Sequence, residues 1–234
     1  MRKDLNHFDD GSNALEDISR LSDRELALRY RPHLRVDRRE PFGLVYLGYR
    51  IFRSSGPSAT FSRDIWVEAP AVLAIEYQLY YDFDIQHLYD LEHLWVWVGA
   101  DGTLLDAEAS EHGSHKNCFR LAEPIEDGTH LPVYVQPGKH AMMPRGELFG
   151  LYGNCETVCN RLAGLDGLPV ADMFRGRILK TPYIDHQVCA YIRGHYAFEP
   201  SWEFIPAPVP EAAVIPWEEL DRIIPERIGL WVGR

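Results

Sequence analysis

The side chains best suited to chemistry gather between positions 82 and 93. Asp90 and Glu92 lie two positions apart on a predicted strand, so both carboxylates project from one face, roughly 6–7 Å apart along the chain. That face continues as alternate apolar residues over 94–98, which puts the carboxylates at the rim of an apolar interior. An unpaired charge there is costly unless a metal ion or an arginine compensates it. The pair therefore predicts a site that holds one cation.

Further candidate ligands lie at the ends of neighbouring strands. His87 precedes the strand that carries Asp90, and the strand before it ends with Asp82 and Asp84 on one face. His140 follows a later strand and can supply a ligand from across the sheet. A mixed carboxylate and imidazole set suits Mg, Ca, Mn, Fe or Zn without distinguishing among them. The predicted metal ligands are Asp82, Asp84, His87, Asp90, Glu92 and His140.

The local charge balance supports a site over scattered surface charges. Any single Asp or Glu is usually exposed, so a surface position is the ordinary interpretation for each residue alone. Together, however, six acidic or imidazole side chains lie between positions 82 and 93, and no Lys or Arg occurs from residue 64 to residue 115. Such a group repels itself unless a cation intervenes, which favours a metal site.

A segment over 108–115 adds a candidate catalytic group. His112 can act as a general acid or base near neutral pH, orient a metal ligand, or bind the ion itself, and we take it as the candidate catalytic residue. A structural role is favoured for His115. No nucleophile elbow surrounds Ser110 or Ser114, and the chain has no phosphate-binding loop or dinucleotide fingerprint. Ordinary nucleotide chemistry is therefore disfavoured.

Alternating apolar residues predict the strands that position these groups. A strand over 75–83 carries one apolar face, and a second strand follows over 90–98. The Asp101-Gly102 pair then predicts a hairpin, with a returning strand over 104–109. A further short strand over 131–135 leads to a Pro-Gly turn just before His140. Four strands are therefore expected to converge on one end of the sheet.

The remaining chain predicts helices at both ends. Ser22 and Glu25 form a capping-box pattern in a helical segment over 13–30. Pro182 and Pro216 suit helix starts, and 154–162 also has a helical pattern. We expect an α+β fold, with an antiparallel β-sandwich core, an N-terminal helical segment and an α-rich C-terminal third. The expected single domain, 1–234, divides into 1–31, 32–145 with the metal site, and 146–234.

Composition narrows the classes of partner. The chain has 234 residues, an apolar fraction of 46% and a formal net charge of −11, and the acidic excess disfavours nucleic acid. No apolar run reaches the ~20 residues that a transmembrane helix needs. The first residues carry charges where a secretory signal has an apolar core, so we expect a cytoplasmic, soluble protein. A small-molecule or glycan ligand is the expected partner, and oligomeric state is left open.

The segment over 87–92 has the spacing H-x-x-D-x-E. In this it resembles the necrosis- and ethylene-inducing-like proteins (the NPP1 family) and, more loosely, the Vps62-type proteins. In the first family, an aromatic strand ending in Asp precedes a GHRHDWE heptapeptide, an alternating apolar strand follows, and a His-Gly pair and a later His complete the pattern. The same order of features is found here, in residues 80–84, 94–98, 112–113 and His140.

The resemblance implies a β-sandwich that binds a divalent cation at one end and engages glycosylated sphingolipid headgroups. It covers residues 75–143 by order and spacing, and the Gly and second His of the heptapeptide are absent, with Leu91 in place of Trp. The C-terminal third has no counterpart. A metal site is compatible with these departures, whereas toxin activity does not follow. The ligands that the resemblance implies are Asp82 or Asp84, His87, Asp90, Glu92 and His140.

Many titratable groups in one pocket favour a metal-dependent enzyme of the hydrolase or lyase class. The alternative is a non-catalytic, cation-dependent module that binds a glycan or a headgroup. A third possibility is an ion that only clamps the strand ends together.

Overall fold

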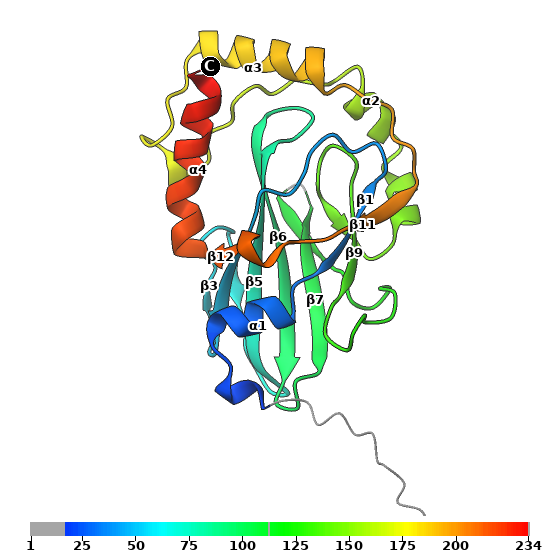
Figure 1. Cartoon of the computed structure of the whole chain (residues 1–234), viewed down its shortest axis with the longest axis vertical. Helices are drawn as coiled ribbons and strands as arrows, with labels where there is room; N and C mark the ends of the chain where they lie inside the picture. Colours follow the sequence, from blue (N-terminus) through cyan, green and yellow to red (C-terminus); the bar gives the residue numbers. More distant parts are fainter. Residues whose placement is uncertain (1–16, 112, 234) are drawn as a thin grey trace, which may run out of the picture.

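A computed structural model describes residues 17–111 and 113–233. Its larger sheet has six strands in the order β12-β2-β5-β6-β7-β8. The long β5 and β6 lie at its centre and form one antiparallel hairpin, with Tyr81 opposite Asp90 and Leu79 opposite Glu92 (Figure 1). The strands are β2 (Tyr46–Phe52), β5 (Ala71–Phe83), β6 (Leu88–Gly99), β7 (Leu104–Glu111), β8 (Ser114–Asn117) and β12 (Val214–Pro216).

A smaller sheet of four strands has the order β10-β9-β1-β11. Its strands are β1 (His33–Asp37), β9 (Pro132–Val135), β10 (Met142–Met143) and β11 (Phe204–Ala207), and β3 (Gly56–Pro57) and β4 (Asp64–Ile65) form a separate hairpin. Buried side chains of both sheets, among them Leu34, Val133 and Val96, belong to one hydrophobic core. The two sheets therefore share an interior.

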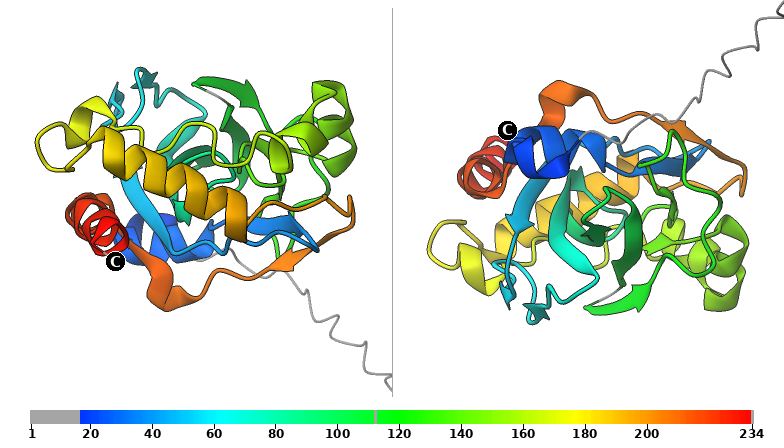
Figure 2. Two further views of the ribbon diagram at one scale, coloured as in Figure 1. Left: turned by 90° about the horizontal axis from the view of Figure 1, so that it is seen from above. Right: turned by 90° about the horizontal axis from the view of Figure 1, so that it is seen from below.

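The helices begin where local sequence signals place them. Ser22 caps α1 with a full capping box to Glu25, and Thr181 caps α3, whose first residue is Pro182. Figure 2 shows α3 lying across the end of the larger sheet, beside α4. The helices are α1 (Asp23–Arg29), α2 (Cys155–Cys159), α3 (Pro182–His195) and α4 (Trp217–Val232), with 3₁₀ turns at Ile18–Arg20, Gly146–Tyr152, Asp172–Phe174 and Glu211–Ala213.

The mixed α+β class and the C-terminal helix agree with the sequence, and two details of the sheets differ. Both sheets are mixed, because β12 pairs parallel to β2 and β9 pairs parallel to β1, so the expectation of a purely antiparallel core is wrong. The C-terminal third also contributes strands, since β11 joins the smaller sheet and β12 the larger one. The sandwich arrangement and the single-domain division stay predictions. In the described part of the chain, no helix has the length and apolar character needed to cross a bilayer.

Candidate functional site

The turn between β5 and β6 is shaped by one carboxylate. Asp84 Oδ1 accepts hydrogen bonds of 2.6 Å from the backbone N–H groups of Gln86 and His87, and the Asp84 N–H donates to the His87 carbonyl at 3.0 Å. This side chain–backbone pattern is a typical use of Asp in a tight turn. The second oxygen, Oδ2, is left to face the neighbouring side chains.

His87 is held in a defined orientation by the backbone. Its Nδ1 lies 2.8 Å from the Tyr89 carbonyl, which can only accept, so Nδ1 carries the proton in the neutral ring. The other nitrogen, Nε2, lies 3.0 Å from Asp84 Oδ2. Two lone pairs that face each other at this distance require a cation or a proton between them.

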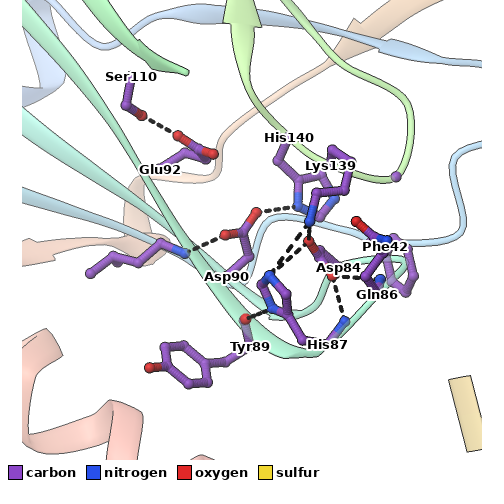
Figure 3. A network of polar contacts seen from close by, with 12 residues as sticks. Phe42, Asp84, Gln86, His87, Tyr89, Asp90, Glu92, Ser110, Lys139 and His140 are labelled. Atoms are coloured by element: carbon purple, nitrogen blue, oxygen red, sulfur yellow. Dashed lines mark hydrogen bonds and ion pairs between the residues drawn. The ribbon is translucent and has the colours of Figure 1, made fainter. Parts of the chain in front are cut away.

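The turn over 137–140, between β9 and β10 of the smaller sheet, supplies that cation. The Lys139 ammonium forms an ion pair with Asp84 and lies 3.5 Å from His87 Nε2 (Figure 3). Gly138 (φ 70°) permits the close approach, because a Cβ there would lie 2.9 Å from Ile85 Cβ and 3.1 Å from Cys159 Sγ. The turn is therefore packed tightly against the β5–β6 hairpin.

His140, the next residue in that turn, pairs with the second aspartate. Its Nδ1 lies 3.0 Å from Asp90 Oδ2, and its ring stacks on Tyr81 with centroids 3.7 Å apart. His140 is fully buried in a left-handed backbone conformation (φ 59°), which is unusual for a residue other than glycine. Its Nε2 has no hydrogen-bond partner among the described residues, and Glu40 Oε1 lies 3.7 Å away. The ring is thus fixed by packing and by two carboxylates.

Electrostatics separate the two carboxylates of β6. Burial opposes ionisation of Asp90, but the hydrogen bond and the charge of His140 outweigh it and hold the pKa of Asp90 below its usual range. Burial also opposes a charge on His140, yet its hydrogen bond to Asp90 and the nearby carboxylate of Glu40, 3.7 Å away, raise its pKa to about 9. Glu92 is different, because burial and then the nearby Asp90 charge raise its pKa to about 8. Near neutral pH the His140–Asp90 pair is charged and Glu92 favours its protonated form.

Asp90 and Glu92, together with His87 and Lys139, line a polar cavity of about 310 Å³. Glu92 is buried in its wall and accepts a hydrogen bond from the Ser110 hydroxyl. Figure 3 shows Glu92 and Ser110 on one side of Asp90, with His87 and Lys139 on the other. Further lining side chains are Thr60, Phe61, Leu91 and His93. The cavity offers both hydrogen-bond donors and acceptors to a polar ligand.

A cation fits the donor set at one end of this cavity. Asp84, His87 and Asp90 each offer a ligand atom, and these atoms all lie within 4.8 Å of one another. The fixed tautomer of His87 leaves Nε2 able to bind, as is common for metal-binding histidines whose other nitrogen donates to a carbonyl. Two carboxylates and one imidazole suit a divalent ion. The Lys139 ammonium, which pairs with Asp84, competes with such an ion for this carboxylate.

The structure brings most of the predicted ligands together, and one lies elsewhere. Asp84, His87, Asp90 and His140 form one contact network, with Glu92 beside Asp90. The Asp82 carboxylate instead binds the Arg227 guanidinium of α4 through contacts of 2.8 and 2.5 Å. Of the two alternatives at the end of β5, Asp84 is the one in the cluster. His112, the candidate catalytic residue, lies outside the described residues.

Sequence reasoning missed the cationic partners of the cluster. Lys139 stands next to the predicted ligand His140 but lies outside the segment 64–115, which contains no Lys or Arg. Arg227 is 145 residues from Asp82 and has no local signal. Ser110 lacks a nucleophile elbow, and its hydroxyl donates a hydrogen bond to Glu92, a pairing that the spacing of the sequence does not indicate.

No protein-family model matches the sequence, and no curated protein sequence matches it. Among solved structures, the chain is similar to NLPPya in complex with glucosamine, with 20% identity and a TM-score of 0.36, over 51% of this chain. It spans 65% of the length of that chain. NLPPya in complex with mannosamine gives 20% identity and a TM-score of 0.33, over 51% of this chain and 66% of that one.

A necrosis and ethylene inducing protein 2, from the causal agent of cocoa's witches broom disease, is similar over 69% of this chain and 94% of its own, with 18% identity and a TM-score of 0.37. The structural neighbours are thus necrosis- and ethylene-inducing proteins, the kind of protein that the sequence resembles, at low identity. The looser Vps62-type resemblance and the metal motif stay predictions.

Proposed function

We propose that the protein binds a polar, hydroxyl-rich ligand, such as a glycan or a glycosylated headgroup, through a divalent cation. The observation that carries this proposal is the group formed by Asp84, His87 and Asp90, whose ligand atoms lie within 4.8 Å of one another beside a polar cavity. These three residues hold the ion, and the ion supplies a positive centre that hydroxyl oxygens can coordinate.

The walls of the cavity match such a ligand. Thr60 and Lys139 donate hydrogen bonds to hydroxyl oxygens, while the Asp90 carboxylate accepts from hydroxyl hydrogens. Phe61 adds an aromatic surface in the same wall, of the kind that can pack on a sugar ring. A cavity of about 310 Å³ is at the small end of ligand sites, so it suits one sugar unit or a headgroup.

A metal-dependent hydrolase or lyase is the second candidate, and Glu92 is the reason to retain it. This buried carboxyl has a pKa raised to about 8 by burial and by the charge of Asp90, so it can hold a proton near neutral pH. Its place in the cavity wall would let it donate that proton to a bound ligand. In this case Glu92, with His112 as a further candidate, moves the proton.

Cation titration tests the proposed site. Protein dialysed against a chelator is titrated with Ca²⁺, Mg²⁺, Mn²⁺ and Zn²⁺ in a calorimeter. We expect Asp84→Asn and Asp90→Asn each to weaken binding at least about tenfold, because each loses a charged ligand. Asp172→Asn is the matched control, since its carboxylate is exposed and lies in a 3₁₀ turn of the C-terminal third. Equal affinities in wild type and both site variants would refute the site.

A glycan panel then separates the two candidate functions. Binding that requires the cation, with ligand recovered chemically unchanged by mass spectrometry, supports a binding protein. Recovery of a cleaved or dehydrated ligand assigns the enzyme instead, and Glu92→Gln should then abolish turnover while leaving cation affinity within a few fold.

A further inference from the structure

A second group of imidazole and carboxylate side chains lies at the start of β1 and in the loop before β9. His33, Asp127 and His130 each offer one ligand atom, and these atoms lie within 4.8 Å of one another. The two rings stack with their centroids 4.3 Å apart and their planes 11° from parallel. Asp127 is exposed and both histidines are partly exposed, so an ion from solvent can reach all three.

Both histidines are held in the tautomer that a metal needs. His130 Nδ1 lies 2.8 Å from the Arg31 carbonyl, which can only accept, so Nδ1 carries the proton in the neutral ring. His33 Nδ1 lies 2.6 Å from the Glu126 carboxylate, which accepts in the same way. Each ring therefore presents the lone pair of Nε2. Binding of one ring nitrogen to a carboxylate or a carbonyl is the usual way in which proteins orient a metal-binding histidine.

The loop that carries two of the three ligands is closed by two backbone hydrogen bonds. The His130 N–H donates to the Glu126 carbonyl at 2.9 Å, and the Glu126 N–H donates to the His130 carbonyl at 2.9 Å. Gly128 (φ 77°) and Asp127 (φ 48°) both adopt left-handed backbone conformations inside this turn. Arg35 forms an ion pair with Glu126, so the positive charge of Arg35 near the cluster is balanced by this carboxylate. The loop therefore fixes Asp127 and His130 beside the strand that carries His33.

From this geometry we infer a second metal site, formed by His33, Asp127 and His130, for a first-row transition metal ion such as Zn²⁺, Fe²⁺ or Co²⁺. Imidazole nitrogen favours these ions over Ca²⁺ and Mg²⁺, and two histidines with one carboxylate form a three-ligand set that leaves positions open to water or to a ligand. Ligand atoms around a tetrahedral ion lie about 3.4 Å apart, given metal–ligand bonds of about 2.0–2.1 Å. The ligand atoms thus need to approach one another by at most about 1.4 Å, which is within the reach of side-chain rotation.

The test uses the full chain with the first site weakened, so that the two sites are read separately. Asp90→Asn protein is titrated with Co²⁺ while visible absorption and binding heat are recorded. We expect one equivalent to bind in this background. Adding His130→Gln or Asp127→Asn should remove that equivalent or weaken it at least about tenfold. Zn²⁺ should displace the bound Co²⁺, as expected for a site with two imidazole ligands.

Two further variants control for unfolding and for the loss of a histidine outside the cluster. Asp127→Asn keeps the exposed turn intact, because Asn tolerates the left-handed backbone, so it remains informative if His130→Gln unfolds the protein. His186→Gln is the matched control, since His186 is exposed on α3, outside the cluster. The inference is overturned if Asp90→Asn binds no Co²⁺, or if Asp127→Asn leaves its affinity unchanged. Failure of the first site leaves this result intact, because wild type would then bind the same single equivalent.

Discussion

Lys139 gives the candidate site a positive charge of its own. Its ammonium pairs with Asp84 and lies 3.5 Å from His87 Nε2, which are two of the three proposed cation ligands. A divalent ion that binds Asp84 and His87 must therefore displace this ammonium. The measured affinity for the ion then includes the free energy of breaking a largely buried ion pair.

Removing this competitor should strengthen cation binding. We expect Lys139→Gln to raise the affinity for a divalent ion about tenfold, equivalent to ~1.4 kcal/mol, because the ion no longer replaces an ammonium. In the absence of the ion the variant should be less stable, since Asp84 loses its partner. Calorimetric titration and urea unfolding measure the two effects. A fall in cation affinity would show instead that Lys139 supports the site.

Glu76 is the residue for which a pH dependence of stability is clearest. It is fully buried on β5, accepts hydrogen bonds from Ser58 and from Trp95 Nε1 (2.9 Å), and its Oε2 has no hydrogen-bond partner within the described chain. Burial raises the pKa of this carboxyl, against the smaller opposing effect of those hydrogen bonds. The folded state therefore binds its proton more tightly than the unfolded state does.

The direction of this pH dependence follows from the linkage between proton binding by Glu76 and folding. A raised folded pKa means that the contribution of Glu76 to stability is greatest below the unfolded pKa and is lost as pH rises through the folded pKa. We expect Glu76→Gln to remove this dependence and to stabilise the protein above that window, by roughly 1–3 kcal/mol. Urea unfolding from pH 4.5 to pH 8 measures it. Glu68→Gln, at an exposed position, is the control, and parallel curves for wild type and Glu76→Gln would contradict the assignment.

For individual residues, the sequence predicted where the cluster lies but not which charged side chain pairs with which aspartate. Strand alternation was enough to place Asp90 and Glu92 on one side of β6, because the two-residue period is a local property. The partners of Asp82 and Asp84 are not local, since Arg227 and Lys139 lie 145 and 55 residues away. Which aspartate enters the cluster was therefore beyond the reach of spacing alone.

Among the elements, α3 depends on a close backbone contact with the loop after α2. Gly164 (φ 67°) lies so near the Cys189 carbonyl that a Cβ would sit 2.2 Å from its oxygen. Both the backbone conformation and the contact exclude a side chain. The position of α3 across the end of the larger sheet (Figure 2) therefore requires glycine here.

Gly164→Ala should destabilise the protein by at least about 2 kcal/mol, because the left-handed backbone and the clash with a carbonyl add together. Gly194→Ala is the matched control within α3, where a Cβ meets nothing within 4 Å and alanine should stabilise by about 0.5–1 kcal/mol. Thermal unfolding measures the stability of both variants relative to wild type. Similar melting temperatures for Gly164→Ala and wild type would contradict the contact.

Elements with local signals were predictable, and those defined by distant pairing were not. The capping box at Ser22, the Pro182 helix start and the β5–β6 hairpin all follow from residues within a few positions of one another. β11 and β12 are short, proline-containing strands whose pairing partners lie more than 150 residues earlier. Nothing in their own sequence distinguishes them from an extended linker.

For the whole molecule, cation binding should appear as added stability. The proposed ligands come from a strand end and a turn that exist only in the folded chain, so the ion favours the folded state. At a concentration of 100 times Kd, we expect a gain of about 2.7 kcal/mol, which raises Tm by roughly 5–10 °C in a chain of this size. Scanning fluorimetry with added ion and with chelator measures the shift. An equal shift in Asp90→Asn would place the ion elsewhere.

The acidic and the basic residues of the candidate site are synthesised at different times during translation. Asp84, His87 and Asp90 all belong to one hairpin, whereas His140 and Lys139 follow their aspartate partners by 50 and 55 residues. The acidic half is therefore translated, and its hairpin can close, while the balancing ammonium is still unmade. These carboxylates therefore gain their partners in the cluster only after residues 139 and 140 have been synthesised.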